Sequence, residues 1–218
     1  MKILVIGGSG FLGSHLCDQL INAGHTVTNY DYSKKKWQNK KCKFIKGNLT
    51  ESNKLDLAIK NKDYVYHFAG ISDINESLNK PLETSIDNIQ GTIKVMQYCV
   101  KHKVKRFLFS SSVYVYSNEG SFYRCSKQAC EEYIVEFNKR FKLNYTILRF
   151  GSIYGPRSDY RNGVYRIIDN AINKKNISYE GNPDAIREYI HVLDAADSCI
   201  KMLDKKFNNQ SFILTGHN

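Results

Sequence analysis

Proline, tryptophan and long apolar runs are scarce in this chain of 218 residues. It holds three prolines and one tryptophan, and it contains neither an internal repeat nor a low-complexity segment. No stretch approaches the roughly 18 consecutive apolar residues that a membrane span needs, and the apolar run after Met1 and Lys2 is too short for a signal peptide. The sequence therefore predicts a folded protein of the cytoplasm, with one full core and at most a small additional lobe.

Paired cysteines are also missing. The six cysteines lie apart from one another, with no pair at two-residue spacing and no histidine pair beside them: Cys17, Cys42, Cys99, Cys125, Cys130 and Cys199. This pattern is not typical of metal sites or disulfides. We expect reduced, mostly buried thiols and no bound metal.

Acidic residues are outnumbered, with 21 Asp and Glu against 32 Lys and Arg, so the formal net charge is +11. A nucleic-acid-binding protein would gather its basic residues with aromatic ones on one face. The sequence shows no such clustering, and nucleic acid is not an expected partner. The lysines suit either a solvated surface or the attraction of an anionic cofactor or nucleotide substrate.

The chain does contain a regular alternation of strand and helix patterns. Short apolar runs predict strands at 2–6, 26–31, 42–47, 63–70, 106–112, 145–150, 177–180, 187–191 and 211–215. Helical periodicity predicts helices at 11–23, 52–60, 81–101, 122–141, 164–173 and 194–203. This alternation specifies an α/β fold with a doubly wound parallel sheet. We expect a dinucleotide-binding Rossmann domain over 1–163 and an incomplete substrate lobe over 164–218, interleaved with the sheet.

A glycine-rich turn follows the first predicted strand. Gly7, Gly10 and Gly13 have the spacing that allows a tight turn, close approach of a pyrophosphate and tight packing of a helix on a strand. The helix start at Phe11 offers free N–H groups and a positive dipole to phosphates. Asp31, which ends the second predicted strand, lies where a carboxylate accepts from the ribose hydroxyls of an adenosine. It favours NAD over NADP, although the lysines at 34–36 act in the opposite direction.

Tyr123 and Lys127 lie four residues apart, on one face of a predicted helix. A free phenol has a pKa near ~10, and we expect the neighbouring ammonium to lower the pKa of Tyr123. Such a tyrosine can take a proton from an alcohol while a cofactor takes the hydride. Ser112, at the carboxyl end of the preceding strand, can hydrogen-bond the reacting oxygen.

Seven motifs together resemble the extended short-chain dehydrogenase/reductase family, the nucleotide-sugar epimerases and dehydratases. They are GGSGFLG from Gly7, HFAG from His67, NIQGT from Asn88, SSSVYVYS from Ser110, YRCSK from Tyr123, LRFGSIYGPR from Leu148 and REYIHVLD from Arg187. The resemblance covers nearly the whole chain. It implies NAD as cofactor, a nucleoside-diphosphate sugar as substrate, and a homodimer formed through the helices at 81–101 and 122–141.

The resemblance also implies roles for individual residues. The catalytic residues would be Ser112, Tyr123 and Lys127. The cofactor would be bound by Gly7, Gly10, Phe11, Leu12, Gly13, Asp31, Asn48, Leu49, Phe68, Ala69, Gly70, Asn88, Ser110, Tyr123 and Lys127. The substrate would be bound by Ser72, Ser112, Ser152, Arg187 and Tyr189. Arg149 is expected to pair with a neighbouring carboxylate or carbonyl, and His191 to pack or to cap a helix.

The chain departs from the family pattern at several positions. Asn48 stands where an aspartate is common, Ser152 replaces a common asparagine, and the short segment 118–122 replaces a longer loop over the sugar. The loop difference predicts a more open sugar site. The sequence ends where relatives continue into the rest of the substrate lobe, which fits either a truncated chain or a thin lobe.

Two reactions and one non-catalytic role remain open. Val113 and Tyr114 occupy the positions where the dehydratases carry Asp and Glu, so dehydration is disfavoured. Epimerisation of a nucleoside-diphosphate hexose is the preferred hypothesis. An NAD(P)H-dependent reductase or dehydrogenase could use the same trio, and a non-catalytic dinucleotide-binding module is a further alternative.

Overall fold

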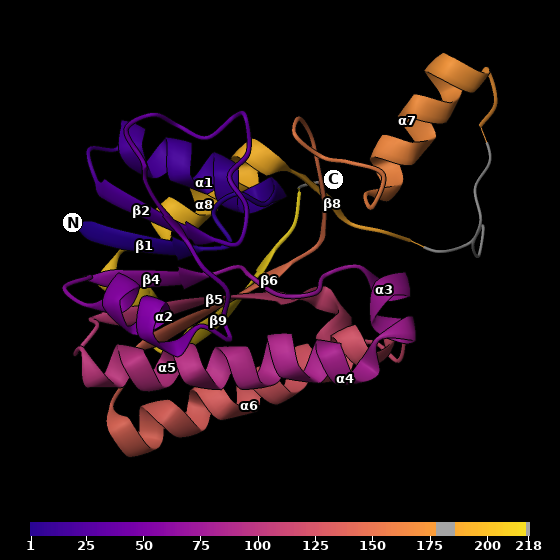
Figure 1. Ribbon diagram of the computed structural model, residues 1–218. Coiled ribbons are helices and arrows are strands. Elements are labelled where there is room, and N and C mark those ends of the chain that lie inside the picture. Colours follow the sequence, from indigo (N-terminus) through magenta and orange to yellow (C-terminus); the bar gives the residue numbers. More distant parts are fainter. Residues whose placement is uncertain (178–185, 217–218) are drawn as a thin grey trace.

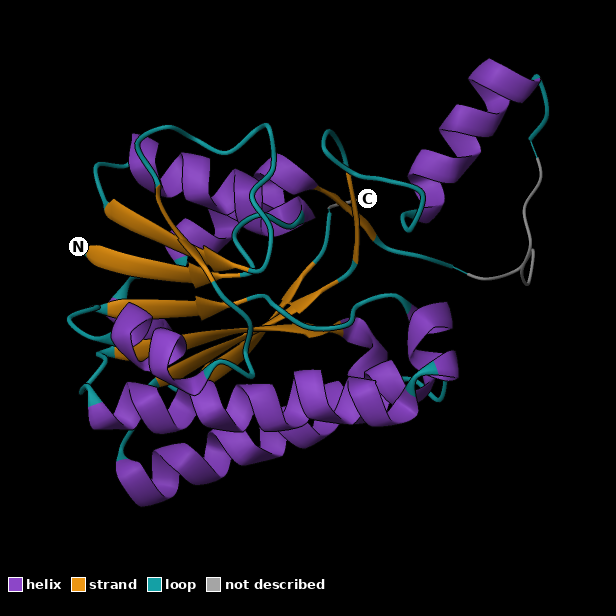
Figure 2. Ribbon diagram, viewed as in Figure 1, coloured by secondary structure: helices purple, strands orange, loops and turns teal. Residues whose placement is uncertain are grey.

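The computed structural model describes residues 1–177 and 186–216. Its main sheet has seven parallel strands in the order β3-β2-β1-β4-β5-β6-β9. The strands are β1 (Lys2–Ile6), β2 (Thr26–Asp31), β3 (Lys43–Lys46), β4 (Tyr64–His67), β5 (Arg106–Ser112), β6 (Tyr145–Phe150) and β9 (Gln210–Leu214). Figure 2 shows this sheet between two layers of helices. The predicted doubly wound fold is confirmed.

The helices divide between the two faces of the sheet (Figure 1). One face carries α1 (Phe11–Asn22) and α8 (Val192–Lys201), and the other carries α2 (Ser52–Ile59), α5 (Gly91–Lys101) and α6 (Ser121–Phe141). β1 supplies both cores in alternation, with Ile3 and Val5 on the α1 side and Leu4 and Ile6 on the α5 side. A strand that is buried on both faces has a continuous apolar sequence, and the apolar run at 2–6 therefore predicted a central strand.

The predicted helix at 81–101 is a composite. It consists of α4 (Pro81–Thr84), a π-helical segment η1 (Ser85–Gln90) and α5. Within this composite helix Met96 is fully buried, whereas Leu82 is 66% exposed. A π-helical turn contains more residues than an α-helical turn, so it shifts the positions that face the core relative to those of one continuous α-helix.

Two short elements near the carboxyl edge of the sheet were not predicted. Helix α3 (Ile74–Asn79) starts at Asp73, whose carboxylate accepts from the amide of Glu76 at 2.8 Å. Strand β7 (Ser152–Tyr154) pairs with β8 (Tyr189–His191) in a separate two-stranded sheet. Segment 151–163 therefore leaves the main sheet. Two 3₁₀ turns, η2 (Val113–Tyr116) and η3 (Lys205–Phe207), follow β5 and α8.

The described elements after residue 162 lie in two separate parts of the molecule. Helix α7 (Gly163–Lys174) has no buried residue and stands apart from the sheet in Figure 1. By contrast, α8 packs against α1, and β9 extends the main sheet beside β6. The strand predicted at 177–180 lies almost wholly outside the described residues.

Candidate functional site

The glycine turn after β1 is closed tightly by neighbouring backbone. Gly7 has φ +86°, and a Cβ there would lie 2.6 Å from the amide nitrogen of Ala69. A Cβ at Gly13 would lie 2.2 Å from the carbonyl oxygen of Gly7. A side chain at either position would therefore displace backbone. At Gly10 the nearest atom, the Gly7 oxygen, is 3.2 Å away, so the protein alone leaves more room there.

Helix α1 starts directly from this turn. Its N-cap is Gly10, which supplies no side-chain hydrogen bond to the first turn. The amides of Phe11 and Leu12 belong to that turn, where α-helices have N–H groups without a partner within the helix. With the helix dipole, these groups favour an anion at the turn.

Asp31 lies at the carboxyl end of β2, beside the glycine turn. Its carboxylate accepts from the amide of Ser9 at 3.0 Å and from the amide of Ser33 at 3.1 Å. Burial raises the pKa of Asp31, and these backbone amides act against that rise. The hydrogen bond to Ser9 fixes the carboxylate relative to the turn.

The remaining expected cofactor residues border the same edge. Asn48 is exposed, and its carbonyl accepts from the hydroxyl of Tyr30 at 2.7 Å. Leu49 is buried next to Gly91. Phe68 and Ala69 follow β4 directly, and their backbone faces Gly7.

Asn88 connects this edge to the helix α6. Its side-chain oxygen accepts from the amide of Ile71 at 2.8 Å, and its side-chain nitrogen donates to the carbonyl of Ile71 and to the hydroxyl of Ser126, both at 2.9 Å. A Cβ on Gly70 would lie 2.5 Å from the Asn88 oxygen. Asn88 is buried, and these bonds tie the loop after β4 to α6.

Ser112, Tyr123 and Lys127 come together between β5 and α6. Lys127 is buried, and its Nζ donates to the carbonyl of Ser110 at 2.7 Å. The same nitrogen lies 4.7 Å from the ring centroid of Phe109 and 5.7 Å from that of Tyr123. Spacing by one helical turn thus brings the phenol and the ammonium to the end of β5.

The pKa of Tyr123 differs from the expectation. Burial raises it to about 12, while a hydrogen bond with Ser112 acts to lower it. Burial also lowers the pKa of Lys127 to about 8. The expected net lowering of the Tyr123 pKa is wrong, because removing the phenol from water disfavours its charged form more than the hydrogen bond with Ser112 favours it.

The expected substrate residues lie on separate segments. Ser72 is exposed in the loop before α3. Ser152 and Tyr189 are register partners in the β7–β8 pair, which brings them side by side. Arg187 donates from Nη1 to the hydroxyl of Tyr114 at 2.9 Å.

Two other sequence expectations are confirmed by the contacts. Arg149 pairs with Glu131, and His191 caps α8 by accepting from the amide of Leu193 at 3.4 Å. Five of the six cysteines are buried as free thiols, and Cys125 is exposed.

Tyr114 and Glu131 are neighbours of the trio that the sequence analysis missed. The amide of Tyr114 donates to the Ser112 hydroxyl at 3.3 Å. Glu131 follows Lys127 by four residues, so extending the Tyr123–Lys127 spacing by one more turn would have found it. No comparable sequence signal marks Tyr114.

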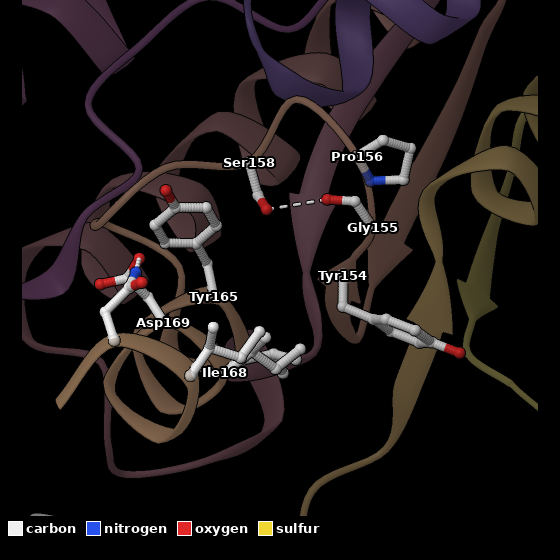
Figure 3. A pocket seen from close by; sticks show the side chains of 10 residues that line it. Tyr154, Gly155, Pro156, Ser158, Tyr165, Ile168 and Asp169 are labelled. Atoms are coloured by element: carbon white, nitrogen blue, oxygen red, sulfur yellow. Dashed lines mark hydrogen bonds between the residues drawn. The ribbon is translucent and has the colours of Figure 1, made fainter. Parts of the chain in front are cut away.

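A hollow of about 380 Å³ lies elsewhere, between the loop after β7 and α7 (Figure 3). Tyr154, Pro156, Tyr165 and Ile168 are among its lining residues. None of the expected catalytic residues lines it, so the site is assigned from the groups around β5 and α6 instead.

The described part of the chain contains neither a metal-binding cluster nor a helix that could span a membrane. Within residues 1–177 and 186–216, no three His, Cys, Asp or Glu side chains are placed to hold a metal ion. Over the same ranges, no helix combines the length and the apolar character that crossing a bilayer requires.

Comparison with known proteins connects this geometry to a family. Residues 3–214 match the family described as the NAD dependent epimerase/dehydratase family. A UDP-glucose 4-epimerase of Klebsiella pneumoniae is 38% identical over 134 residues, which cover 55% of this chain and 94% of the relative. A UDP-N-acetyl-alpha-D-glucosaminuronate decarboxylase of Bacillus cytotoxicus is 26% identical over 96% of this chain and 73% of its own length.

A solved structure agrees in fold over almost the whole chain. The UDP-glucose 4-epimerase of Thermotoga maritima, crystallised with UDP-glucose, superposes with a TM-score of 0.92 at 26% identity. The match covers 99% of this chain and 77% of the Thermotoga chain.

Proposed function

Because the chain belongs to the NAD dependent epimerase/dehydratase family, we propose that it epimerises a nucleoside-diphosphate hexose at a sugar hydroxyl through transient oxidation. The observation that carries this proposal is the meeting of Ser112, Tyr123 and Lys127 at the end of β5. The 4-hydroxyl of a UDP-hexose is the preferred target, since the Klebsiella and Thermotoga relatives are UDP-glucose 4-epimerases.

The residues around the glycine turn fit NAD. Gly10 leaves space against which a pyrophosphate could lie, and the first turn of α1 directs amides toward the same place. Asp31 presents a carboxylate next to that turn, suited to the adenosine ribose. When bound, NAD supplies a hydride acceptor and the positive charge of its oxidised ring.

The proton is handled by the chain's own side chains. In this mechanism Tyr123 takes the proton from the sugar hydroxyl, and Ser112 hydrogen-bonds the same oxygen. In the proposed mechanism the ammonium of Lys127 and the positive charge that oxidised NAD would bring favour the phenolate. They act against the burial that raises the pKa of Tyr123. After the keto-sugar turns in the site, Tyr123 returns the proton to the sugar oxygen, and the bound cofactor would supply the hydride to the other face of the same carbon.

Substrate binding is proposed for residues at the mouth of this site. Ser72, Ser152, Arg187 and Tyr189 come from three segments that border the carboxyl edge. Arg187 is suited to a diphosphate because a guanidinium can donate two parallel hydrogen bonds. Its contact with Tyr114 extends it toward the segment that carries Ser112.

A direct assay tests the proposed reaction. We expect the purified protein to retain NAD, detectable by mass spectrometry after denaturation, and to interconvert UDP-glucose and UDP-galactose without net NADH formation. Stoichiometric release of NADH with an oxidised sugar would favour the dehydrogenase alternative. Retention of NAD without conversion of any nucleoside-diphosphate hexose tested would contradict the epimerase proposal.

A cytoplasmic homodimer belongs to the same proposal. The free thiols suit a reducing compartment, and exposed apolar side chains on the outer helices, among them Leu82 and Phe141, suit a helix-to-helix interface. Sedimentation equilibrium should give twice the 25.1 kDa mass of one chain. A single species at the monomer mass across micromolar concentrations would contradict the dimer.

A further inference from the structure

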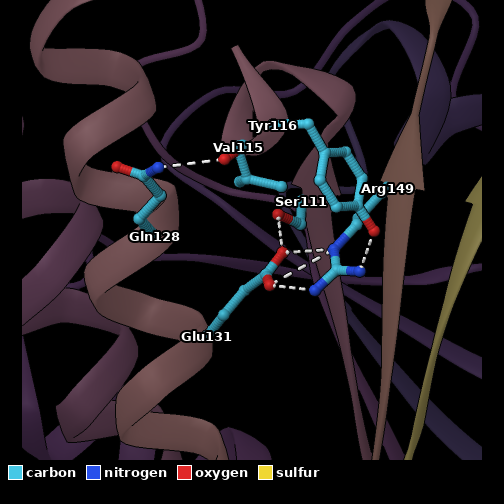
Figure 4. A network of polar contacts seen from close by, with 6 residues as sticks. All are labelled: Ser111, Val115, Tyr116, Gln128, Glu131 and Arg149. Atoms are coloured by element: carbon cyan, nitrogen blue, oxygen red, sulfur yellow. Dashed lines mark hydrogen bonds and ion pairs between the residues drawn. The ribbon is translucent and has the colours of Figure 1, made fainter. Parts of the chain in front are cut away.

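The carboxylate of Glu131 connects α6 to two neighbouring strands of the sheet (Figure 4). It accepts from the hydroxyl of Ser111 on β5 at 2.5 Å. It also accepts from Nε of Arg149 on β6, at 3.0 and 3.2 Å to its two oxygens, and from Nη2 of the same arginine. One side chain of α6 is thereby fixed to two adjacent strands of the sheet.

These contacts lie at the level of the catalytic residues. Tyr123, Lys127 and Glu131 succeed one another at four-residue spacing on α6, so they share one face of the helix. On the sheet, Ser111 is the register partner of Arg149 and directly precedes Ser112. The Glu131 carboxylate therefore connects the helix that carries the phenol and the ammonium to the strand that carries the serine.

The η2 turn completes the network from the solvent side. The hydroxyl of Tyr116 accepts from Nη1 of Arg149, and the Tyr116 ring lies 4.9 Å from the guanidinium carbon. Gln128 of α6 donates to the carbonyl of Val115 at 2.9 Å. These contacts hold the turn that follows Ser112 against the same helix.

The ion pair between Arg149 and Glu131 is largely shielded from solvent. The side chains of Arg149 and Glu131 are 19% and 11% exposed, whereas most ion pairs of the described chain are on the surface. A forked, bidentate arginine fixes a carboxylate in direction as well as in distance. Lysine cannot reproduce that geometry, although it keeps the charge.

We propose that Glu131 and Arg149 are positioning residues that hold Tyr123 and Lys127 in register with Ser112. This role rests on the proposed function, in which those three residues handle the proton. Neither Glu131 nor Arg149 needs to touch the sugar or NAD. Glu131 also acts on its neighbour electrostatically, because its charge raises the pKa of Lys127 against the effect of burial.

The test compares Arg149→Lys with Arg157→Lys. The control pair, Arg157 with Asp18, is also partly shielded, with side chains 23% and 25% exposed, and it joins α1 to the loop after β7. We expect Arg149→Lys to lower kcat roughly 10- to 100-fold, since displacements near 1 Å cost rates of that order. KM and NAD retention should stay within about twofold of the wild type, because most residues assigned to the substrate and to NAD lie on segments that the pair does not contact.

A second measurement follows the position of Lys127 without relying on turnover. Lys127 is 6% exposed, so its acylation by an amine-reactive reagent, followed by peptide mass spectrometry, reports how tightly α6 is held. We expect the rate of Lys127 labelling to rise several-fold in Arg149→Lys and to stay at the wild-type value in Arg157→Lys. If the wild type converts no nucleotide sugar, the proposed function fails, and this labelling result still decides the positioning role.

The two variants give distinguishable results. A fall in kcat and faster Lys127 labelling in Arg149→Lys alone support the proposal. Equal losses of thermal midpoint in both variants, with unchanged kcat and unchanged Lys127 labelling, would show a structural ion pair and overturn it. A rise in KM at constant kcat would overturn it as well, since it would place Arg149 in substrate binding.

Discussion

Replacement of Tyr123 by phenylalanine is expected to lower kcat for sugar epimerisation by about 10²- to 10⁴-fold, the range that one positioned acid–base group supplies. Phenylalanine keeps the ring that lies 5.7 Å from the Lys127 ammonium, but it cannot take or return the proton. The variant should still retain NAD, because the glycine turn and Asp31 are unchanged. The measurement is the rate of UDP-glucose and UDP-galactose interconversion, with bound NAD quantified in the same samples.

Tyr160→Phe is the matched control. Tyr160 also carries a hydrogen-bonded phenol, with Asp169 as its partner, but it is exposed on the segment before α7. Its replacement should leave kcat unchanged. An unchanged rate in Tyr123→Phe, with the control equally active, would end the enzymatic assignment of this phenol.

Much of the fold followed from burial patterns in the sequence. Strands such as β1 are apolar on both faces because helices cover both sides of a parallel sheet, and that pattern is local. By contrast, the local pattern could not show which residues of the helix beginning at Pro81 face the core, since this depends on the π-helical turn that contains Asn88. The pairing of β7 with β8 joins segments more than thirty residues apart, and neither segment signals its partner.

In the candidate site, too, some features follow from local spacing in the sequence and others depend on the folded structure. The four-residue spacing of Tyr123 and Lys127 was sufficient to place them on one face of α6. The pKa of Tyr123 was not predictable from that spacing, because it depends on how much water the fold removes from around the phenol. The sequence predicted that Arg149 pairs with a carboxylate or carbonyl, but it did not identify Glu131 as the partner, because Glu131 lies on another element of the fold.

Gly10→Ala is expected to separate cofactor binding from folding. The backbone at Gly10, with φ −71° and ψ 179°, is one that alanine adopts readily. Its Cβ would meet only the Gly7 carbonyl oxygen, at 3.2 Å, so the fold should accommodate it with a small shift. The added methyl group would occupy the space proposed for the pyrophosphate, and NAD affinity should fall at least tenfold, about 1.4 kcal/mol, as measured by calorimetric titration of protein stripped of nucleotide.

Two other glycines supply the comparison for this experiment. Gly13→Ala should lower both NAD affinity and thermal stability, because its Cβ would lie 2.2 Å from the Gly7 oxygen and force the turn apart. Gly163→Ala should change neither, since the nearest atom to its Cβ is the end of the Arg166 side chain at 4.0 Å. If Gly10→Ala bound NAD as tightly as Gly163→Ala does, the dinucleotide could not lie against this turn, and the assignment of the glycine turn at 7–13 to its phosphates would be wrong.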